Sequence, residues 1–538
     1  MPPASPRGSS ASPSPQTLFD RADQLDLRVP TSCGRSGRCH ECIVEVKQGG
    51  EHLGPRTPAE SFLRDPFRLA CQAEVREAAA ALRFAPLTRQ PQILMPEAGG
   101  VPDLDPLVQR EGDRVLFDGE QLDHYRGRLL GLALDLGTTT LVLELVDLEQ
   151  GRVLAVASCE NPQRFGGSDV MNRISYDGGA HRGELHQAVI RAVNRLARQL
   201  CRQQDCSRRQ IYALVVAGNA TMRELFFGLE VQSIGQKPYK SLVEHEWRAG
   251  RRQSTSLLVE ARELHLRLHP RARVYGLPLI ASHVGGDTAA ALVAIDAWNC
   301  RELVMLVDIG TNTEVVVGDG QRWVAASCPA GPAFEGGLIQ YGMPGFAGAI
   351  ERVRWVDGGF ACSTIGGGPP EGLCGSGLID LLAELRRHGR MTPKGVFADK
   401  AYTLEVAPAQ GITFSREDAS HLAQAKAANY CGQYIALRHF GAAPARVQRL
   451  FLAGGFANYI DVANAVEIGF LAPVPAQHIF KIGNAAAQGA RQVLLSRRRR
   501  QAVEALVPTI EHVELETTPD FFELFVEGCQ FKPMPDTF

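Results

Sequence analysis

Short apolar runs alternate with helix-length segments over most of the chain from Gly131 onward. Four runs, each with a glycine at or near its end, cover residues 132–137, 212–219, 303–310 and 449–456. Continuous apolar runs of this length are typical of strands buried on both faces of a sheet. Alanine-rich segments such as residues 416–439 are long enough for helices. The pattern therefore predicts an α/β fold.

Two of the apolar runs begin copies of one internal repeat. Residues 132–147 align with residues 306–319, and the matched pairs are Asp135 with Asp308, Gly137 with Gly310, Thr138 with Thr311 and Thr140 with Thr313. Each copy predicts a strand, a tight turn and a second strand. Glycine in such a turn lets backbone N–H groups approach a phosphate, threonine adds hydroxyl donors, and aspartate at a strand end can hold a metal ion.

We therefore predict that both turns contact phosphate and metal. The predicted contacts are Asp135, Gly137, Thr138, Thr139 and Thr140 in the first copy and Asp308, Gly310, Thr311, Asn312 and Thr313 in the second. Asp135 and Asp308 are the catalytic candidates. Ordinary hairpin turns are the alternative, but two copies separated by most of a domain favour a phosphate site.

Other glycine-rich positions complete the predicted site. Gly454, Gly455 and Phe456 follow a buried strand, where paired glycines let an adenosine lie against the backbone. Two predicted helix starts could face phosphate, and they carry Gly285, Gly286, Asp287, Gly375 and Ser376. A helix cap at Asp287 and a closely packed helix start at Gly375 are the alternatives. Glu335 is a candidate for polarising water, unless it is a structural loop carboxylate.

Four cysteines near the start of the chain predict an iron–sulfur site. Cys33, Cys39, Cys42 and Cys71 have the spacing C-x5-C-x2-C-x28-C, which is close to the plant-type ferredoxin pattern for a [2Fe–2S] cluster. A zinc site would more often use two separated C-x2-C pairs or Cys/His pairs. Scattered structural cysteines would not place three thiols within ten residues. We predict that these four thiolates hold the cluster.

Charge and composition narrow the class of protein. The net charge of −2 gives no electrostatic footprint for nucleic acid. The only basic block, residues 497–500, is predicted to be a solvated helix end. No apolar run is long enough for a bilayer, and the Pro/Ser-rich start lacks an apolar signal core. Thirteen mostly scattered cysteines suit a reducing compartment. We expect a cytoplasmic protein.

These patterns divide the chain into five parts. The predicted parts are a disordered tail at residues 1–16, a cysteine domain at 17–77, a linker or reduced middle region at 78–128, a first lobe at 129–300 and a second lobe at 301–538. The cysteine domain is predicted to contain a helix over 18–27 and a strand and turn over 43–50.

The two turns and the adenosine loop resemble the acetate kinase, sugar kinase, Hsp70 and actin superfamily. With the cysteine domain, the chain resembles the reductive activators of corrinoid-dependent enzymes. Further similar stretches are residues 161–174, 216–222, 283–292, 328–337, 372–380 and 483–490. The resemblance implies a two-lobed actin/Hsp70-like ATPase with a small α+β ferredoxin-like domain of the β-grasp type. The chain departs from the family in its short cysteine domain, which begins at a helix rather than a β-hairpin.

The resemblance also implies an activity: ATP-dependent transfer of one electron from a [2Fe–2S] cluster to a Co(II) corrinoid protein of a methyltransferase system. The implied cofactors are the cluster, ATP and Mg²⁺. We expect an unidentified electron donor, a homodimer, and no nucleic acid or membrane partner. Ser327 could contact the partner's corrinoid, with a solvated turn serine as the alternative. The competing functions are activation of another low-potential enzyme, a small-molecule kinase with a redox-sensing domain, and an ATP-gated chaperone of cobalamin proteins.

Overall fold

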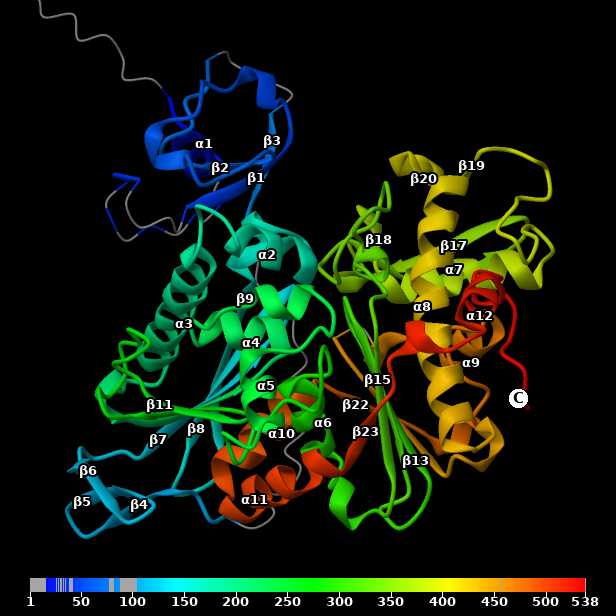
Figure 1. Cartoon of the computed structure of the whole chain (residues 1–538). Helices are drawn as coiled ribbons and strands as arrows, with labels where there is room; N and C mark the ends of the chain where they lie inside the picture. Colours follow the sequence, from blue (N-terminus) through cyan, green and yellow to red (C-terminus); the bar gives the residue numbers. More distant parts are fainter. Residues whose placement is uncertain are drawn as a thin grey trace, which may run out of the picture. The chain divides into compact units, whose positions relative to one another are not determined.

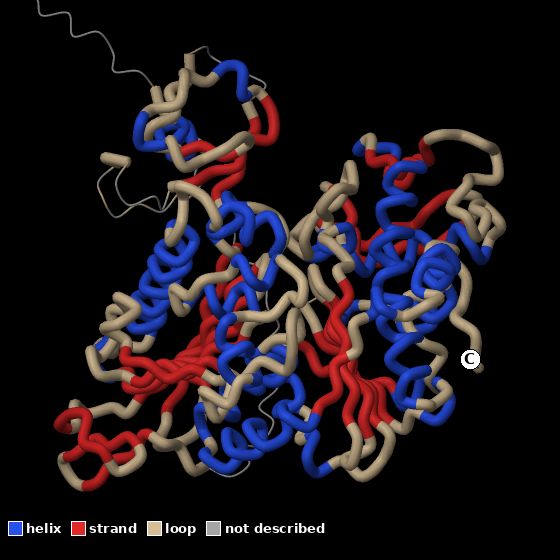
Figure 2. The backbone as a smooth tube through the Cα atoms, in the orientation of Figure 1, coloured by secondary structure: helices blue, strands red, loops and turns tan. Residues whose placement is uncertain are grey.

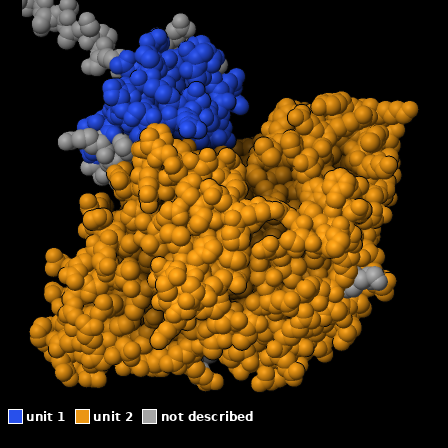
Figure 3. Space-filling view, in the orientation of Figure 1, with its two compact units in different colours: residues 1–89 blue, residues 90–538 orange. Residues whose placement is uncertain are grey.

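The computed structural model describes residues 16–25, 27, 29, 31, 33, 35–37, 42–76, 82–87, 104–455 and 457–537. The chain forms two compact units, residues 1–89 and 90–538, which Figure 3 colours blue and orange. Each unit is described by itself below. Cys39, Phe456 and most of the predicted tail lie outside the described residues.

The first unit combines one helix with a small sheet. Helix α1 (Leu18–Gln24) begins at a capping box formed by Thr17 and Asp20. The antiparallel sheet has the order β2-β1-β3, with β1 at Ile43–Gln48, β2 at Phe67–Leu69 and β3 at Arg83–Pro86. The predicted helix and strand are confirmed. Strand β3 pairs with β1, so this unit extends past the predicted end at residue 77.

A buried ion pair fixes the segment that leads to Cys71. Arg68 Nε lies 2.8 Å from Glu60 Oε1, and Glu60 is completely buried. The same carboxylate oxygen accepts a hydrogen bond from the Leu69 backbone N–H at 3.0 Å. A buried carboxylate with several donors is well satisfied and strongly constrains the backbone that supplies them.

The second unit contains two six-stranded sheets that share the arrangement of five strands, while the sixth strand lies at opposite edges (Figure 1). The first has the order β11-β12-β10-β7-β8-β9, with β7 at Leu130–Leu136, β8 at Thr140–Asp147, β9 at Val153–Glu160, β10 at Ile211–Ala217, β11 at Leu257–Glu260 and β12 at Arg273–Gly276. The second has the order β22-β21-β13-β14-β15-β23, with β13 at Val304–Ile309, β14 at Thr313–Gly318, β15 at Trp323–Cys328, β21 at Arg449–Ala453, β22 at Ile479–Gly483 and β23 at Ile510–His512.

The internal repeat predicted from the sequence is confirmed in these sheets. In each one an antiparallel meander, β7-β8-β9 or β13-β14-β15, is extended by a parallel strand, β10 or β21. Each parallel strand pairs with the first strand of its meander. The two predicted turns therefore connect corresponding strands of the two sheets, β7 to β8 in the first and β13 to β14 in the second.

Helices cover both sheets and also lie between them (Figures 1 and 2). Helix α3 (Glu184–Gln203) packs on the outer face of the first sheet, and α8 (Arg416–Phe440) on the outer face of the second. Helices α6 (Gly286–Ala294), α10 (Ala485–Leu495) and α11 (Arg497–Leu506) share a core with residues of both sheets. The segment 485–506 thus packs on the first sheet, whereas the sequence-based division assigned it to the second lobe.

Smaller elements surround this framework. The remaining helices are α2 (Val170–Asp177), α4 (Ala220–Phe226), α5 (Leu242–Arg248), α7 (Gly375–Arg387), α9 (Val462–Glu467) and α12 (Phe521–Gly528). A three-stranded sheet comprises β16 (Ala349–Val356), β17 (Gly359–Thr364) and β18 (Gly372–Leu373), and a hairpin comprises β19 (Thr403–Ala407) and β20 (Ile412–Ser415). In the part of the chain that the structure describes, no helix combines the length and apolarity needed to cross a membrane.

A small antiparallel sheet occupies much of the region predicted as a linker. It comprises β4 (Val108–Glu111), β5 (Arg114–Phe117) and β6 (Glu120–His124). Val108, Val115 and Leu122 are buried in the core beside the first sheet. The apolar pattern is weak here because these strands are short and mostly polar.

The basic block at residues 497–500 is only partly exposed, whereas the sequence predicts a solvated helix end. It forms the first turn of α11. The Arg500 guanidinium lies 3.7 Å from the ring centroid of Tyr275, and that of Arg499 lies 5.6 Å from Trp298. Arg499 is only 8% exposed. The aromatic partners lie about two hundred residues earlier in the sequence, so the block alone could not reveal this packing.

Candidate functional site

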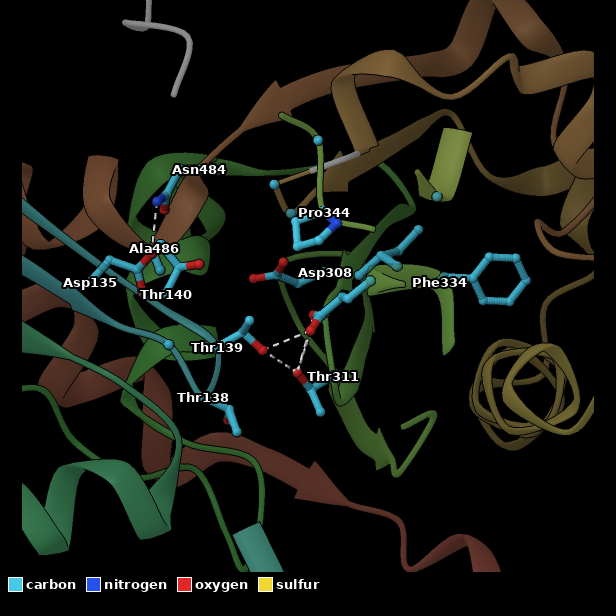
Figure 4. Close-up of a pocket in the computed structure, with 18 of the residues that line it drawn as sticks. Asp135, Thr138, Thr139, Thr140, Asp308, Thr311, Phe334, Pro344, Asn484 and Ala486 are labelled. Carbon is cyan, nitrogen blue, oxygen red and sulfur yellow. Dashed lines mark hydrogen bonds between the residues drawn. The ribbon is translucent and has the colours of Figure 1, made fainter. Parts of the chain in front are cut away.

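A cavity of about 320 Å³ lies where the two predicted turns face each other (Figure 4). The predicted residues that line it are Asp135, Gly137, Thr138, Thr139, Thr140, Asp287, Asp308, Gly310, Thr311, Asn312, Glu335, Gly375, Ser376, Gly454 and Gly455. Four predicted residues do not line it: Gly285, Gly286, Thr313 and Ser327. The cavity therefore brings together residues from both sheets and from the starts of two helices.

The two turns are closed by short backbone hydrogen bonds. The Gly137 N–H donates to Thr140 O at 3.0 Å, and the Gly310 N–H donates to Asn312 O at 3.1 Å. A Cβ atom at position 137 would lie 2.7 Å from Thr140 O, so only glycine fits the first turn without a shift. These tight turns leave the residues that follow each glycine facing the cavity.

Glu335 joins the two turns. Its carboxylate accepts a hydrogen bond from Thr139 Oγ1 at 2.7 Å and from Thr311 Oγ1 at 2.9 Å. The two threonine hydroxyls are themselves 3.0 Å apart, as Figure 4 shows. Burial raises the pKa of Glu335, and the threonine hydroxyls partly offset this by lowering it. In this structure Glu335 bridges the halves of the site, while its predicted action on water stays a prediction.

Half-buried carboxylates gather around the cavity. Burial raises the pKa of Asp135 and of Asp308 to about 7 and that of Asp287 to about 6, and the Asp287 charge adds to the first two shifts. Only a neutral group counters this at Asp135, where Asn484 Nδ2 donates at 2.7 Å. Figure 4 shows the Asp308 carboxylate directed into the space between the turns. Carboxylates that lie close together are costly to ionise without a positive charge between them, and their oxygen atoms suit a hard divalent cation.

The start of α6 supplies one of these carboxylates. Asp287 Oδ1 accepts a hydrogen bond from the Thr288 N–H at 2.8 Å while also lining the cavity. Gly285 instead permits close packing, because a Cβ there would lie 2.4 Å from Asn219 Cα. The Gly286 N–H donates to Gly218 O at 2.9 Å. These two glycines therefore pack α6 against the first sheet and do not line the cavity, and their predicted contact with a ligand stays a prediction.

The glycine pair after β21 has two different roles. Gly454 has φ +111°, and a Cβ there would lie 2.1 Å from Ile309 O, so glycine lets this loop pass the end of β13. A Cβ at Gly455 would meet nothing within 4 Å. Gly455 therefore contributes open space in the cavity, as an adenosine loop requires.

Two predicted residues lie behind the second turn. Ser327 Oγ donates to Glu314 Oε1 at 3.1 Å. The expected exposed hydroxyl at Ser327 is therefore not found, because Ser327 lies directly opposite Glu314 in the β14–β15 pair and both side chains are on the same face of the sheet. Thr313 is completely buried. Both residues support the sheet rather than line the cavity.

Four polar residues that support the site were not predicted as site residues. Asn161, Arg173, Asn219 and Asn484 are donors to backbone or side chains of the first turn and to Asp135. Each lies in one of the stretches singled out in the sequence. The sequence signal that could have indicated them is a polar residue among apolar positions or shortly after them. Asn219, for example, follows the apolar residues 212–217 and Gly218.

Two of the predicted cluster ligands lie together in the first unit. Cys42 Sγ and Cys71 Sγ are 3.4 Å apart and both residues are buried. A hydrogen bond from Cys42, with further donors from Gln72 and the Gly37 N–H, lowers the pKa of Cys71 to about 6. Thiolates are the form that ligates iron.

The loop around these thiols also fits a cluster site. Gly37 has φ +76°, and a Cβ there would lie 3.0 Å from Gln72. Cys33 is close enough to influence the pKa of Cys71. Among the described residues, which leave out Cys39, no three His, Cys, Asp or Glu side chains are already arranged around a metal position. The thiol chemistry fits the predicted cluster.

Three family models match successive parts of the chain. Residues 6–76 match a 2Fe-2S iron-sulfur cluster binding domain, residues 130–298 match the RACo middle region, and residues 302–537 match the C-terminal domain of RACo, described as the ASKHA domain. ASKHA is the superfamily of acetate kinase, sugar kinase, Hsp70 and actin, so the predicted fold class is confirmed.

Similar proteins match over nearly the whole length. The corrinoid activation enzyme RamQ of Eubacterium limosum is 28% identical over 96% of both chains. The [Co(II) methylated amine-specific corrinoid protein] reductase of Methanosarcina barkeri is 23% identical over 74% of this chain and 76% of its own. A solved structure of a reductive activator for corrinoid, iron-sulfur protein has a TM-score of 0.72 and 29% identity, covering 96% of this chain and 95% of its own. The chain belongs to the RACo family of reductive activators of corrinoid proteins.

Proposed function

We propose that this protein uses ATP to transfer one electron to an inactive Co(II) corrinoid protein and so restores Co(I) in a methyltransferase system. The observation that carries this proposal is the presence, on one chain, of a paired-thiol site and a cleft of two facing phosphate turns. A full-length relative described as a corrinoid activation enzyme supports it.

The four cysteines would hold a [2Fe–2S] cluster. Cys42 and Cys71, whose sulfur atoms lie close together, would be two of the ligands, and Cys33 and Cys39 would be the other two. When bound, the cluster supplies single electrons, at about −400 mV for plant-type centres. The protein would contribute the lowered pKa of the Cys71 thiol and the buried surroundings of Cys42 and Cys71.

The cleft in the second unit would hold ATP with Mg²⁺. Asp135, Asp287 and Asp308 are the candidate ligands of the ion or of its waters, because their carboxylates share the cavity with the phosphate turns. Gly455 leaves open space for the adenosine. Glu335 contacts both turns, so its carboxylate would lie close to phosphates bound between them.

ATP is needed if the cobalt couple lies below the cluster potential. A gap on the order of 100 mV for one electron corresponds to about 2.3 kcal/mol. A nucleotide can shift such an equilibrium only if its bound states favour different states of the partner complex. We therefore place the coupling in the complex with the corrinoid protein. A homodimer and a cytoplasmic location stay predictions.

The test is an anaerobic reduction assay. The reduced protein is mixed with a Co(II) corrinoid protein, and Co(I) absorbance is followed with and without ATP. We expect Co(I) only with ATP. Asp308→Ala should abolish the ATP-dependent reduction but keep the cluster spectrum, since the two sites are on different units.

Asp319→Ala is the matched control, because Asp319 lies in the same repeat and caps an exposed turn through Gln321 and Arg322. It should reduce cobalt at the parent rate. Co(I) forming equally fast without ATP would overturn the proposal and favour the small-molecule kinase alternative.

A further inference from the structure

The carbonyl groups of the first phosphate turn are held from behind by buried donors. Asn161 Nδ2 donates to Gly137 O at 2.8 Å, and the Asn161 N–H donates to Thr139 O at 2.7 Å. Between them, Arg173 Nη2 donates to Thr138 O at 2.6 Å. Asn161 is 0% exposed and Arg173 is 1% exposed. Three successive carbonyls therefore point into the protein.

This arrangement sets the direction of the amides. In a planar trans peptide the C=O and the following N–H point in opposite directions. The N–H groups of Thr138 and Thr139 belong to the peptides whose carbonyls are held by Asn161 and Arg173. They consequently point away from the buried donors. Both residues line the cavity, so the two amides form part of a concave anion site.

Arg173 is a buried cation without an ion pair. Its other contacts are Gly167 O at 3.0 Å from Nε and Met222 Sδ at 3.0 Å from Nη1. Among the residues that the structure describes, no carboxylate forms an ion pair with it. Burial lowers its pKa to about 9, although the charge of Asp169 raises it, and Arg173 stays cationic near neutral pH. A buried charge with no carboxylate in direct contact is costly, and an anion bound nearby would offset that cost.

Among the described residues, the second turn has no equivalent cation. Thr311 O, which corresponds to Thr138 O in the repeat, accepts a hydrogen bond from the neutral Gly331 backbone N–H at 2.8 Å. The two turns connect equivalent strands of the two sheets but differ in length and in the charge behind them. The first turn is therefore the better site for the more highly charged part of an anionic ligand.

We propose that Arg173 is a positioning residue that aims the Thr138 and Thr139 amides at the polyphosphate of the bound nucleotide and adds a positive charge behind them. It makes the affinity of the cleft depend on the phosphates rather than on the nucleoside. This inference rests on the proposed function only in that the cleft binds ATP.

The test compares two ligands by calorimetric titration of the full-length protein with Mg²⁺ present. ATP reports on the phosphates, and adenosine reports on the nucleoside pocket. Arg173→Met should weaken ATP binding by about 10-fold or more, since a hydrogen bond to a charged group is lost, and leave adenosine binding within about twofold. Arg173→Lys, which keeps the charge but loses the planar fork, should recover part of the ATP affinity.

Arg223→Lys is the matched control. Arg223 is equally buried in the same lobe, but it binds Glu224 and the carbonyls of Thr255 and Leu277 instead of the turn. This variant should lose thermal stability and keep the parent ratio of ATP to adenosine affinity. A purely structural role for Arg173 would give the same result at both positions.

The outcomes separate this inference from the proposed function. A parent protein that binds no ATP would contradict the nucleotide cleft itself. A parent that binds ATP, with Arg173 variants that weaken ATP and adenosine equally or neither, would overturn the role of Arg173 alone. Where Arg173→Met does not fold, Arg173→Lys decides: an ATP to adenosine affinity ratio equal to the parent's overturns the inference, and a lowered ratio supports it.

Discussion

Asp135, Asp287 and Asp308 come from β7, α6 and β13 and meet at one cavity. Burial, and then the charge of neighbouring carboxylates, raises the pKa of Asp135 and Asp308. The folded chain without a cation therefore keeps protons on these groups at a pH where the unfolded chain has lost them. Protons and Mg²⁺ compete for the same oxygens.

This competition predicts a pH-dependent effect of Mg²⁺ on stability. The carboxyls titrate near pH 4 when unfolded and near pH 6 to 7 when folded. The stability they contribute is complete below about pH 4 and is lost as pH rises through 6 to 7. We predict that Mg²⁺, compared with EDTA, raises the melting temperature more at pH 8 than at pH 5.5.

Differential scanning fluorimetry measures this difference directly. Asp308→Asn removes one of the carboxylates and should shrink the Mg²⁺ effect at pH 8. An equal effect of Mg²⁺ at both pH values would contradict the assignment of these aspartates to a cation.

The sequence predicted that Asp135, Asp308 and their turns share one site, because the two copies of the repeat align residue by residue. It could not predict the residues that hold them. Asn484 lies 349 positions from Asp135, and Arg173 lies 35 positions from Thr138. Their contacts arise from packing between elements, which leaves no periodic pattern in the chain. Ser327 was misjudged for the same reason, since its hydroxyl is satisfied across the sheet by Glu314.

Helices α6 and α10 cross at very short range. A Cβ at Gly489 in α10 would lie 1.8 Å from Ala290 O in α6. Only glycine allows this approach, although alanine is the better helix former by about 1 kcal/mol. The crossing matters for the site because α6 begins at Asp287 and α10 begins at Asn484.

We predict that Gly489→Ala destabilises the second unit by about 1–3 kcal/mol, because forcing the helices apart outweighs the gain in helix propensity. The measurement is the free energy of unfolding in guanidinium chloride. Gly359→Ala is the control, since a Cβ there meets nothing within 4 Å and its φ is not positive. Equal stability of the two variants would show that the helices can separate at little cost.

At the level of elements, the long buried strands and helix α8 were predictable and the short ones were not. Helix α8 carries its own boundaries, a capping box of Ser415 with Asp418 and a C-terminal Gly441 at φ +84°. Strands β4 to β6 have four or five residues each and few apolar positions. Their stability comes from the core beside the first sheet, which the local sequence does not show.

The whole molecule consists of two units with separate cores, one with the thiol pair and one with the cleft. We predict that a chain comprising residues 90–538 binds ATP with the parent affinity and contains no iron. Calorimetry and iron analysis check the two parts of this prediction. Failure of this fragment to bind ATP while remaining folded would show that the first unit contributes to the cleft.

Within the second unit the chain passes between its two sheets at α6, before β13, and again at α10, after β22. These two helices are in contact and connect the two halves of the unit. A rotation of one half against the other would take place about these two helices. The displacement of an atom in such a rotation grows with its distance from them. Because both helices start at the cavity, an adjustment of a few tenths of an ångström around the phosphates would become a larger displacement at the outer edges of the two halves.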